Sequence, residues 1–240
     1  MPRPKKKSAA RVIPMPRPEA DAQLTGQAED YLKAIYELER GDRAAGTNDI
    51  AARLGIAAAS VSGMVQRLAR LGLVQAERYR GARLSAAGRT AALRLIRRHR
   101  IIESYLVERL GFGWDDVHEE AERLEHAASD ELIARMAEAI GNPTEDPHGA
   151  PIPSPTGEVD ETRLGSIADL PEGQTARVVR MSDRDPEFLR YLDGMGVRPG
   201  VRVQLLTREP FEGPLTLLVD GSTRTMGTST ATRVFIRVDP

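Results

Sequence analysis

The chain has 240 residues with 34 basic and 35 acidic side chains, which suggests one or two domains, and its net charge of −1 alone favours no polyanionic partner. Cysteine is absent, which excludes a disulfide framework, a thiolate metal site and a cysteine nucleophile. The sequence lacks the apolar centre of a signal peptide and any apolar run as long as a membrane span, so we expect a cytoplasmic protein.

The chain begins with a stretch unlike the rest. Residues 1–18 hold six basic side chains, five prolines and no acidic residue. This composition predicts a disordered basic arm over residues 1–23. Such an arm either reaches toward nucleic acid or is only a solvated tail.

Residues 24–85 are expected to form a winged helix-turn-helix DNA-binding domain. Three helical patterns follow one another, and the second is short and starts with Thr47 as its expected N-cap. A pattern of two arginine-rich strands comes next and is expected to turn at Gly81. A small helical bundle could also give three helices in a row, but it does not explain the short second helix and the arginine hairpin.

The third helix is rich in small side chains, which would let it approach base edges closely. Its amide, Gln66, could face either the core or solvent, while serines and arginines would contact phosphates. DNA shape and apolar contacts with thymine methyl groups should therefore dominate recognition. The predicted DNA-binding residues are Thr47, Ala57, Ala59, Ser60, Ser62, Gly63, Gln66, Arg67, Arg70 and Arg80.

Residues 86–140 predict a helical domain. The long helix that follows Ser85 carries apolar side chains on more than one face, which fits either a dimer interface or burial within the subunit. Two shorter helices should follow, the first capped by Asp115 and Asp116 and the second starting at Ser129.

Three of the four histidines fall within this helical domain, and glutamates accompany them at helical spacing. Imidazole and carboxylate without thiol are the ligands of a borderline-to-hard divalent ion. The same spacing also fits solvated or salt-bridged polar faces, because arginines lie close by, and the spacing alone leaves both interpretations open. The candidate ligands are His99, Glu103, His118, Glu122, Glu125 and His126.

The last hundred residues change character twice. Five prolines mark residues 141–163 as a tether, and its His148 is expected to have a conformational or solvated role outside any site. Residues 164–240 show short alternating runs with turn signals and one helical insert, which predict a small β-barrel.

Together these features resemble the diphtheria toxin repressor family of iron- and manganese-dependent transcriptional regulators, from about Leu24 onward. The most specific parts are H-x3-E at His99 and H-x3-E-x2-E-H from His118 to His126, ahead of the segment PHGAPIP. The resemblance implies a mainly α protein with a C-terminal β-barrel. Its expected parts are a winged helix-turn-helix (24–85), metal-binding and dimerisation helices (86–140), a Pro-rich tether (141–163) and an SH3-like domain of the ferrous-transport-accessory, or FeoA, type (164–240).

The resemblance also implies two separate metal sites in each subunit. The primary site would consist of Asp30, Glu122, Glu125 and His126. The ancillary site would consist of His99, Glu103, His118 and a C-terminal ligand, for which Asp183 is preferred to Asp185 or Glu187.

The expected metal is Mn²⁺, with Fe²⁺ next. The iron-selective branch of the family has methionine and cysteine where this chain has Asp30 and Glu122, and hard carboxylates favour Mn²⁺. One manganese subgroup has a second glutamate where this chain has Lys33, which argues for two separated sites and against a two-manganese cluster.

These features predict a homodimeric, metal-activated repressor that binds a double-stranded DNA operator, with no membrane partner and no small organic ligand. An enzyme is not expected, because the histidines in HEEAERLEH are eight residues apart and do not fit the H-E-x-x-H motif of metallohydrolases. The remaining alternative is a metal-independent winged-helix protein whose C-terminal barrel binds another protein.

Overall fold

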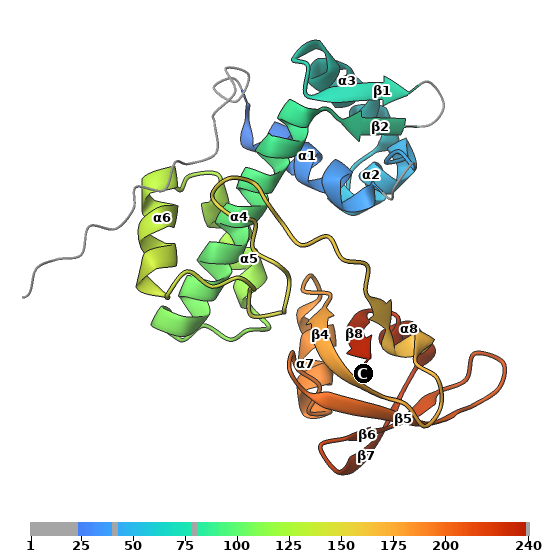
Figure 1. Cartoon of the computed structure of the whole chain (residues 1–240). Helices are drawn as coiled ribbons and strands as arrows, with labels where there is room; N and C mark the ends of the chain where they lie inside the picture. The colour runs from blue at the N-terminus through green and yellow to red at the C-terminus, as the bar shows by residue number, and fades with distance from the viewer. Residues whose placement is uncertain (1–23, 40–42, 78–80, 239–240) are drawn as a thin grey trace, which may run out of the picture. The chain divides into compact units, whose positions relative to one another are not determined.

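The computed structural model describes residues 24–39, 43–77 and 81–238, and Figure 1 shows their arrangement into helices and strands. The predicted basic arm and the predicted DNA contact Arg80 lie outside the described residues. Packing divides the chain into two compact units, made of residues 1–95 with 153–158 and of residues 96–152 with 159–240. The domain bounds expected from the sequence stay a prediction.

The first unit contains the expected winged helix-turn-helix elements in the expected order. They are α1 (Gly26–Leu38), α2 (Thr47–Leu54), α3 (Ala58–Arg70), β1 (Val74–Glu77) and β2 (Gly81–Leu84). Apolar side chains recur at helical spacing on all three helices, and their buried faces meet in one core. Tyr31, Ile35, Ile50 and Leu68 are fully buried there.

The start of α2 differs from the prediction by one residue. Gly46 is its N-cap, so Thr47 is the first helical residue and the predicted threonine cap is wrong. Glycine is also accepted at this position, because an N-cap needs an extended backbone. A Cβ on Gly46 would lie 2.9 Å from Oδ2 of Asp49, which leaves little room for a side chain.

The wing is held to the rest of the first unit through its backbone. Strands β1 and β2 pair antiparallel, and Ala82 also exchanges two backbone hydrogen bonds of 2.9 Å with Ala45. This close approach requires Gly81, which has φ +112° and whose Cβ would meet the carbonyl oxygen of Ala45 at 2.0 Å. The wing root is therefore fixed by a residue that tolerates no side chain.

The division between the units falls within the long helix α4 (Ala86–Leu110). In the second unit, its later part packs with α5 (Val117–Glu125) and α6 (Asp130–Ala139). The side chain of Ser129 accepts a hydrogen bond from the N–H of Leu132, which confirms the predicted start of α6. Asp116 is the N-cap residue of α5, without a side-chain capping bond.

The remainder of the second unit is a six-stranded antiparallel sheet in the order β3-β8-β4-β5-β6-β7. Its elements are β3 (Gly165–Ser166), the 3-10 helix η2 (Ile167–Asp169), β4 (Thr175–Met181), α7 (Pro186–Gly194), β5 (Arg202–Arg208), β6 (Leu215–Val219), β7 (Ser222–Met226), α8 (Thr228–Ala231) and β8 (Val234–Val238). Buried apolar residues of the strands and of α7 form its core, and Trp114 packs against them.

The predicted closed barrel is wrong, because the sheet is open. A barrel requires its two edge strands to pair. Among the described residues, β3 pairs with β8 and β7 pairs with β6, but the two edges do not pair with each other. The edge strand β3 has only two residues, too few to complete a ring of strands.

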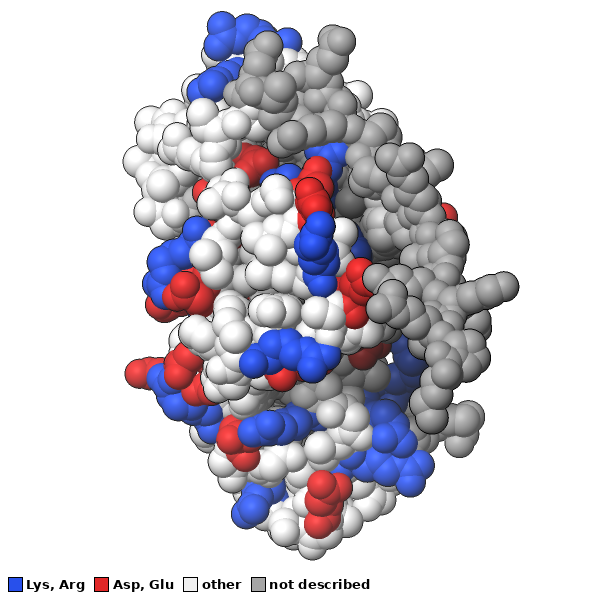
Figure 2. Space-filling model, turned by 90° about the vertical axis from the view of Figure 1, so that its left-hand side faces the viewer, with Lys and Arg blue, Asp and Glu red and all other residues white. Residues whose placement is uncertain are grey.

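Basic and acidic side chains are interspersed over the face of the molecule drawn in Figure 2, in line with the near-zero net charge. In the described part of the chain, none of the helices combines the length and the apolar character needed to cross a membrane.

Candidate metal centre

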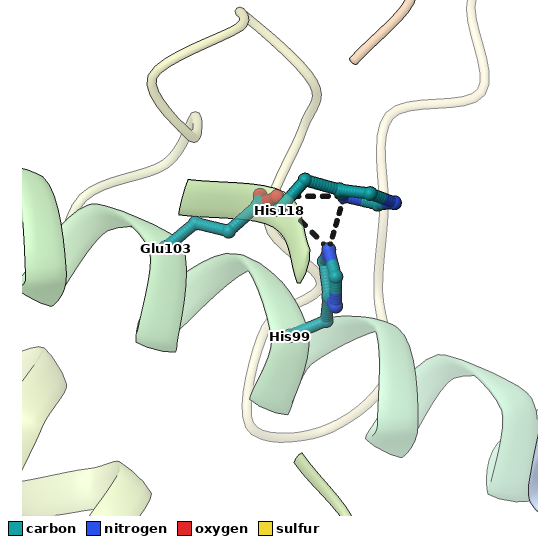
Figure 3. A group of neighbouring side chains, drawn as sticks. All are labelled: His99, Glu103 and His118. Carbon is teal, nitrogen blue, oxygen red and sulfur yellow. Dashed lines mark hydrogen bonds and ion pairs between the residues drawn. The ribbon is translucent and has the colours of Figure 1, made fainter. Parts of the chain in front are cut away.

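Three of the predicted ligands meet inside the second unit. His99 and Glu103 lie one turn apart on α4, and His118 comes from α5 (Figure 3). Oε1 of Glu103 lies 2.9 Å from Nε2 of His99 and 3.0 Å from Nδ1 of His118, and the two ring nitrogens are 2.9 Å apart. We call these three residues the helix triad.

The helix triad is buried, which makes its protonation interdependent. Burial raises the pKa of Glu103, but the charge of His99 and hydrogen bonds from both histidines outweigh it and hold the pKa well below its ordinary range. Burial lowers the pKa of His118, but hydrogen bonds to Glu103 and Glu122 and the charge of Asp183 raise it to about 10. In the metal-free protein, a protonated His118 therefore donates to an ionised Glu103.

A second group uses the other oxygen of the same glutamate. Glu103, Asp146, His148 and Asp183 offer ligand atoms that all lie within 4.8 Å of one another. We call these four residues the tether group, because Asp146 and His148 come from the Pro-rich tether. The predicted ligand Asp183 belongs to this group.

The tautomer of His148 follows from its neighbours. Its Nε2 lies 2.6 Å from the carbonyl oxygen of Trp114, which can only accept, so Nε2 carries the proton. In a neutral ring, Nδ1 then presents a lone pair. The Nδ1 atom lies 3.9 Å from Oε2 of Glu103 and 3.9 Å from Oδ1 of Asp146. A histidine that donates one ring N–H to a backbone carbonyl is oriented as metal-binding histidines commonly are.

Three buried atoms of the tether group have no hydrogen-bond partner among the residues that the structure describes. They are Oε2 of Glu103, Oδ2 of Asp146 and Nδ1 of His148. Arg100 offers Asp146 a charge, with Nε 3.5 Å from Oδ2, but no hydrogen bond. Burial and then the charge of Glu103 raise the pKa of Asp146 to about 6. Buried carboxylate and imidazole atoms without hydrogen-bond partners suit a cation, so these ligand atoms fit a hard divalent ion.

Backbone hydrogen bonds of the tether hold the side chains of Asp146 and His148 in position. Oδ1 of Asp146 accepts the N–H of His148 at 2.8 Å and that of Ala150 at 2.9 Å, and the carbonyl oxygen of His148 accepts the N–H of Met181 at 3.1 Å. Gly149, with φ +82°, passes so close to β4 that a Cβ would lie 1.9 Å from the carbonyl oxygen of Val179.

The expectation that His148 is solvated or outside the site is wrong, because its side chain is fully buried beside Glu103. Asp146 was also missed by the sequence analysis. The signal available in the sequence was an aspartate two residues before the histidine of the Pro-rich tether. Their burial depends on the docking of the tether, which the local pattern does not reveal.

The predicted primary ligands lie on two elements. Glu125 on α5 is buried and its Oε2 lies 2.5 Å from Nδ1 of His99, while its Oε1 lies 3.8 Å from Nε2 of the exposed His126. Glu122 is exposed, with Oε1 3.5 Å from Nε2 of His118. Asp30 is half-buried on α1 in the first unit, and its participation stays a prediction.

The predicted DNA-binding residues of α3 form the exposed face of that helix. Val61, Val65 and Leu68 are buried on the opposite face, so Gln66 faces solvent rather than the core. A Cβ on Gly63 would have no atom within 4 Å, so this face is open at its centre. The exposed predicted contacts are Ala57, Ala59, Ser60, Ser62, Gly63, Gln66, Arg67 and Arg70, and Thr47 is half-buried.

Comparison with known proteins identifies the parts of the chain. Residues 23–82 match the N-terminal DNA-binding domain of iron-dependent repressors, and residues 85–154 match the metal-binding and dimerisation domain of the same proteins. Residues 166–238 match the FeoA domain.

Whole proteins match over most of their length. The chain is 32% identical over 211 residues to the iron-dependent repressor IdeR of Mycobacterium tuberculosis, which covers 83% of this chain and 91% of that protein. It is 34% identical over 197 residues to the diphtheria toxin repressor of Corynebacterium glutamicum, which covers 78% and 86%. A solved structure of a manganese-dependent transcriptional repressor in complex with manganese is 39% identical, with a TM-score of 0.82 over 88% of this chain and 100% of that one. The chain therefore belongs to the diphtheria toxin repressor family of metal-dependent transcriptional repressors.

Proposed function

We propose that this protein is a homodimeric repressor whose binding to a DNA operator requires a divalent metal ion, with Mn²⁺ preferred and Fe²⁺ next. A repressor that acts on DNA is expected in the cytoplasm. The observation that carries the proposal is the tether group, in which three buried atoms that can bind a cation have no hydrogen-bond partner among the described residues. Leaving such atoms unsatisfied is costly, and a cation removes the cost.

Glu103, Asp146, His148 and Asp183 would hold the ancillary ion. Glu103 and Asp183 are retained from the predicted ligands, while His99 and His118 would hold Glu103 through its other oxygen, Oε1. Arg100 places one positive charge beside Asp146, and a bound ion would supply further positive charge directly at the unsatisfied atoms. His148→Ala should then remove one ion per subunit, whereas His118→Ala should leave the number of ions unchanged, as counted by elemental analysis of the dialysed protein.

Asp30, Glu122, Glu125 and His126 would hold the primary ion. Asp30 belongs to the first unit and the other three to the second, so the site would connect the DNA-binding helices to the dimerisation helices. Without positive charge, three carboxylates brought together repel one another, and the two units stay loosely oriented. The ion would bind the DNA-competent arrangement more tightly than other arrangements, and this difference in affinity would drive the protein toward DNA binding.

The choice of metal follows from the donor atoms. The proposed primary site offers three carboxylates and one imidazole without sulfur, and the tether group has the same composition. Oxygen ligands suit Mn²⁺, although the intrinsic affinity order places Fe²⁺ above it. The preference would therefore rest on ligand geometry and on which ion is available.

A second copy of the chain is the proposed partner of the exposed apolar side chains on the helical part of the second unit. Large apolar side chains are exposed at the end of α4, in the segment that follows it and on the next two helices, and they are Leu110, Phe112, Leu124 and Leu132. Large apolar side chains left exposed to solvent are candidates for contact with a second copy, since contiguous exposed apolar surface marks protein interfaces. Sedimentation of Leu124→Glu beside the unchanged protein tests this. If Leu124 lies in a dimer interface, the introduced charge should convert the dimer to a monomer.

The decisive experiment is an anaerobic titration of metal-stripped protein with Mn²⁺ and, separately, Fe²⁺, with DNA binding as the readout. The duplex is first selected from a random pool by the metal-loaded protein. Binding should appear only as the ion is added. If the geometry of the carboxylate ligands determines the metal preference, half-maximal binding should need a lower concentration of Mn²⁺ than of Fe²⁺. Equal binding by the metal-stripped protein would support the metal-independent alternative.

A further inference from the structure

The segment between α4 and α5 contacts the sheet of the second unit. Its Trp114, the only tryptophan of the chain, is partly buried and packs against the apolar core of the sheet. The helices α5 and α6 and the sheet belong to the same compact unit, so this contact lies within one unit. We call residues 114–116 the corner. Burial of an indole ring removes a large apolar area from water, so Trp114 is the main anchor between the corner and the sheet.

The ring of Trp114 also contacts two side chains outside the helices. The guanidinium of Arg198, which follows α7, lies 4.9 Å from the centroid of the indole ring, within the range of a cation–π contact. Nε of Arg198 donates to Oδ1 of Asp193 on α7 at 2.5 Å, which holds the guanidinium in place. The ring centroid of His148 lies 5.7 Å from that of Trp114. One side chain of the corner therefore contacts both the tether and the segment beside α7.

The two aspartates of the corner bind a second arginine. Nη1 of Arg190 on α7 donates to Oδ1 of Asp116 at 3.1 Å and to Oδ2 of Asp115 at 3.3 Å. Asp116 is the N-cap residue of α5, where an aspartate usually accepts an N–H of its own helix, but its carboxylate binds Arg190 instead. Exposed ion pairs contribute little stability alone, so we expect these pairs to orient the sheet on the corner rather than to hold it there.

Hydrogen bonds connect the corner to the ligands of the tether group. The carbonyl oxygen of Trp114 accepts Nε2–H of His148 at 2.6 Å, and the carbonyl oxygen of His148 accepts the N–H of Met181 at 3.1 Å. Met181 is the last residue of β4, and Asp183 follows two residues later. The way in which the sheet sits on the corner therefore determines how Asp183 meets Glu103.

We propose that Trp114, Arg190 and Arg198 dock the sheet on the helices without a metal ion. The docked sheet positions Asp183 beside Glu103, where the two carboxylates would receive the ancillary ion. None of the three docking residues is a proposed ligand, so their contacts need no ion. An ion that meets ligands already in place binds more tightly, because less free energy is lost in ordering the protein. The part of the proposal that concerns the ion rests on the proposed function, whereas the docking does not.

The test measures docking in the metal-stripped, full-length protein. Because the chain has no cysteine, spin labels can be attached to Ala134→Cys on α6 and Ser222→Cys on β7, which are both exposed positions. Labelled chains are diluted with unlabelled chains, so that a dimer carries one labelled pair. The otherwise unchanged protein should give one narrow distribution of label-to-label distances. Trp114→Ala should broaden it, whereas Trp114→Phe retains an aromatic ring and should keep it narrow.

The arginines are tested by combining Arg190→Gln with Arg198→Gln, which should broaden the distribution less than Trp114→Ala does. Arg135→Gln is the matched control for a lost ion pair, because the exposed pair of Arg135 with Glu131 lies within α6. Phe211→Ala is the control for a lost aromatic ring, because Phe211 is fully exposed between β5 and β6. Both controls should leave the distribution narrow.

Affinity for the ancillary ion is measured separately, by equilibrium dialysis of each variant against Mn²⁺. The ion that is lost in His148→Ala identifies the ancillary one. Trp114→Ala should weaken its binding by about tenfold or more, as loss of an orienting partner commonly does, and Trp114→Phe should weaken it less. The melting temperature of each variant shows whether it is folded.

The docking is overturned if the metal-stripped protein with an unchanged corner gives a broad distribution, or if Trp114→Ala keeps a narrow one. Should Trp114→Ala not fold, an arginine variant as narrow as Arg135→Gln overturns it. The positioning of Asp183 is overturned if a folded variant broadens the distribution without losing affinity for the ancillary ion. Failure of the proposed function gives a different result, in which the sheet is docked but His148→Ala binds as many ions as the unchanged protein.

Discussion

Nδ1 of His99 lies 2.5 Å from Oε2 of Glu125, and both side chains are buried. His99 belongs to the helix triad beside the proposed ancillary site, whereas Glu125 is a proposed primary ligand. His99 therefore connects the two proposed sites, because its Nδ1 lies beside Glu125 and its Nε2 lies 2.9 Å from Oε1 of Glu103 in the tether group. Residues joined in this way do not act independently when they are replaced.

This contact predicts the relative effects of the two residues. His99→Ala should raise the metal concentration for half-maximal DNA binding by about tenfold, as loss of an orienting partner commonly does. Glu125→Ala should raise it further, because it removes a direct ligand. The double variant should show less than the product of the single effects. A larger effect of His99→Ala, or strictly multiplicative effects, would contradict the assignment.

Asp30→Ala should leave the dimer folded and lower metal-dependent DNA affinity by about tenfold or more. The reason is that Asp30 is the proposed primary ligand from the DNA-binding unit. DNA affinity at limiting Mn²⁺ is the measurement, and Glu29→Ala on the same helix is the control. If Asp30→Ala and the unchanged protein have the same DNA affinity at limiting Mn²⁺, the proposed role of Asp30 as a primary ligand is wrong.

Replacing Asp30 with methionine and Glu122 with cysteine should shift activation away from Mn²⁺ and toward Fe²⁺ or Co²⁺. Softer sulfur ligands lose little with the later metals but bind Mn²⁺ poorly. The measured quantity is the ratio of the half-activating concentrations of Mn²⁺ and Fe²⁺ under anaerobic conditions. An unchanged ratio would mean that ligand hardness does not determine the preference.

Gly63→Gln should fold normally and alter the preferred DNA sequence. The position is open, with no atom within 4 Å of an added Cβ, and an amide there could hydrogen-bond base edges. Arg67→Ala should instead weaken all duplexes alike and flatten the salt slope by about 0.9. Sequence selection from a random pool, together with salt titrations, separates the two effects. Sequence-selective loss in Arg67→Ala would show that this arginine reads bases.

Gly149→Ala should lower both the melting temperature of the protein and its capacity for the ancillary ion. The added Cβ would meet the carbonyl oxygen of Val179, and moving the tether displaces Asp146 and His148. Gly194→Ala in α7 is the control, since it has open space and should change stability by no more than about 1 kcal/mol. Normal metal capacity in Gly149→Ala would show that the tether group is not the ancillary site.

The sequence alone determined the features that depend on local spacing. His99 and Glu103 share a helix face because they are four residues apart, and the small exposed residues of α3 follow from the same periodicity. The order of helices, wing, tether and strands could also be predicted, because alternation and turn residues act over short distances.

Only the tertiary structure decided what depends on distant segments. His148 lies 45 positions after Glu103 in the sequence, and its ring is oriented by the carbonyl oxygen of Trp114, a contact that no periodicity encodes. The open sheet likewise depends on whether its edge strands meet, which their alternation of apolar residues does not specify. Local patterns determine which face of an element is apolar, whereas the approach of two elements depends on the packing of the whole unit. That packing brought Asp146 and His148, in a tether that the sequence marked as irregular, against a buried glutamate.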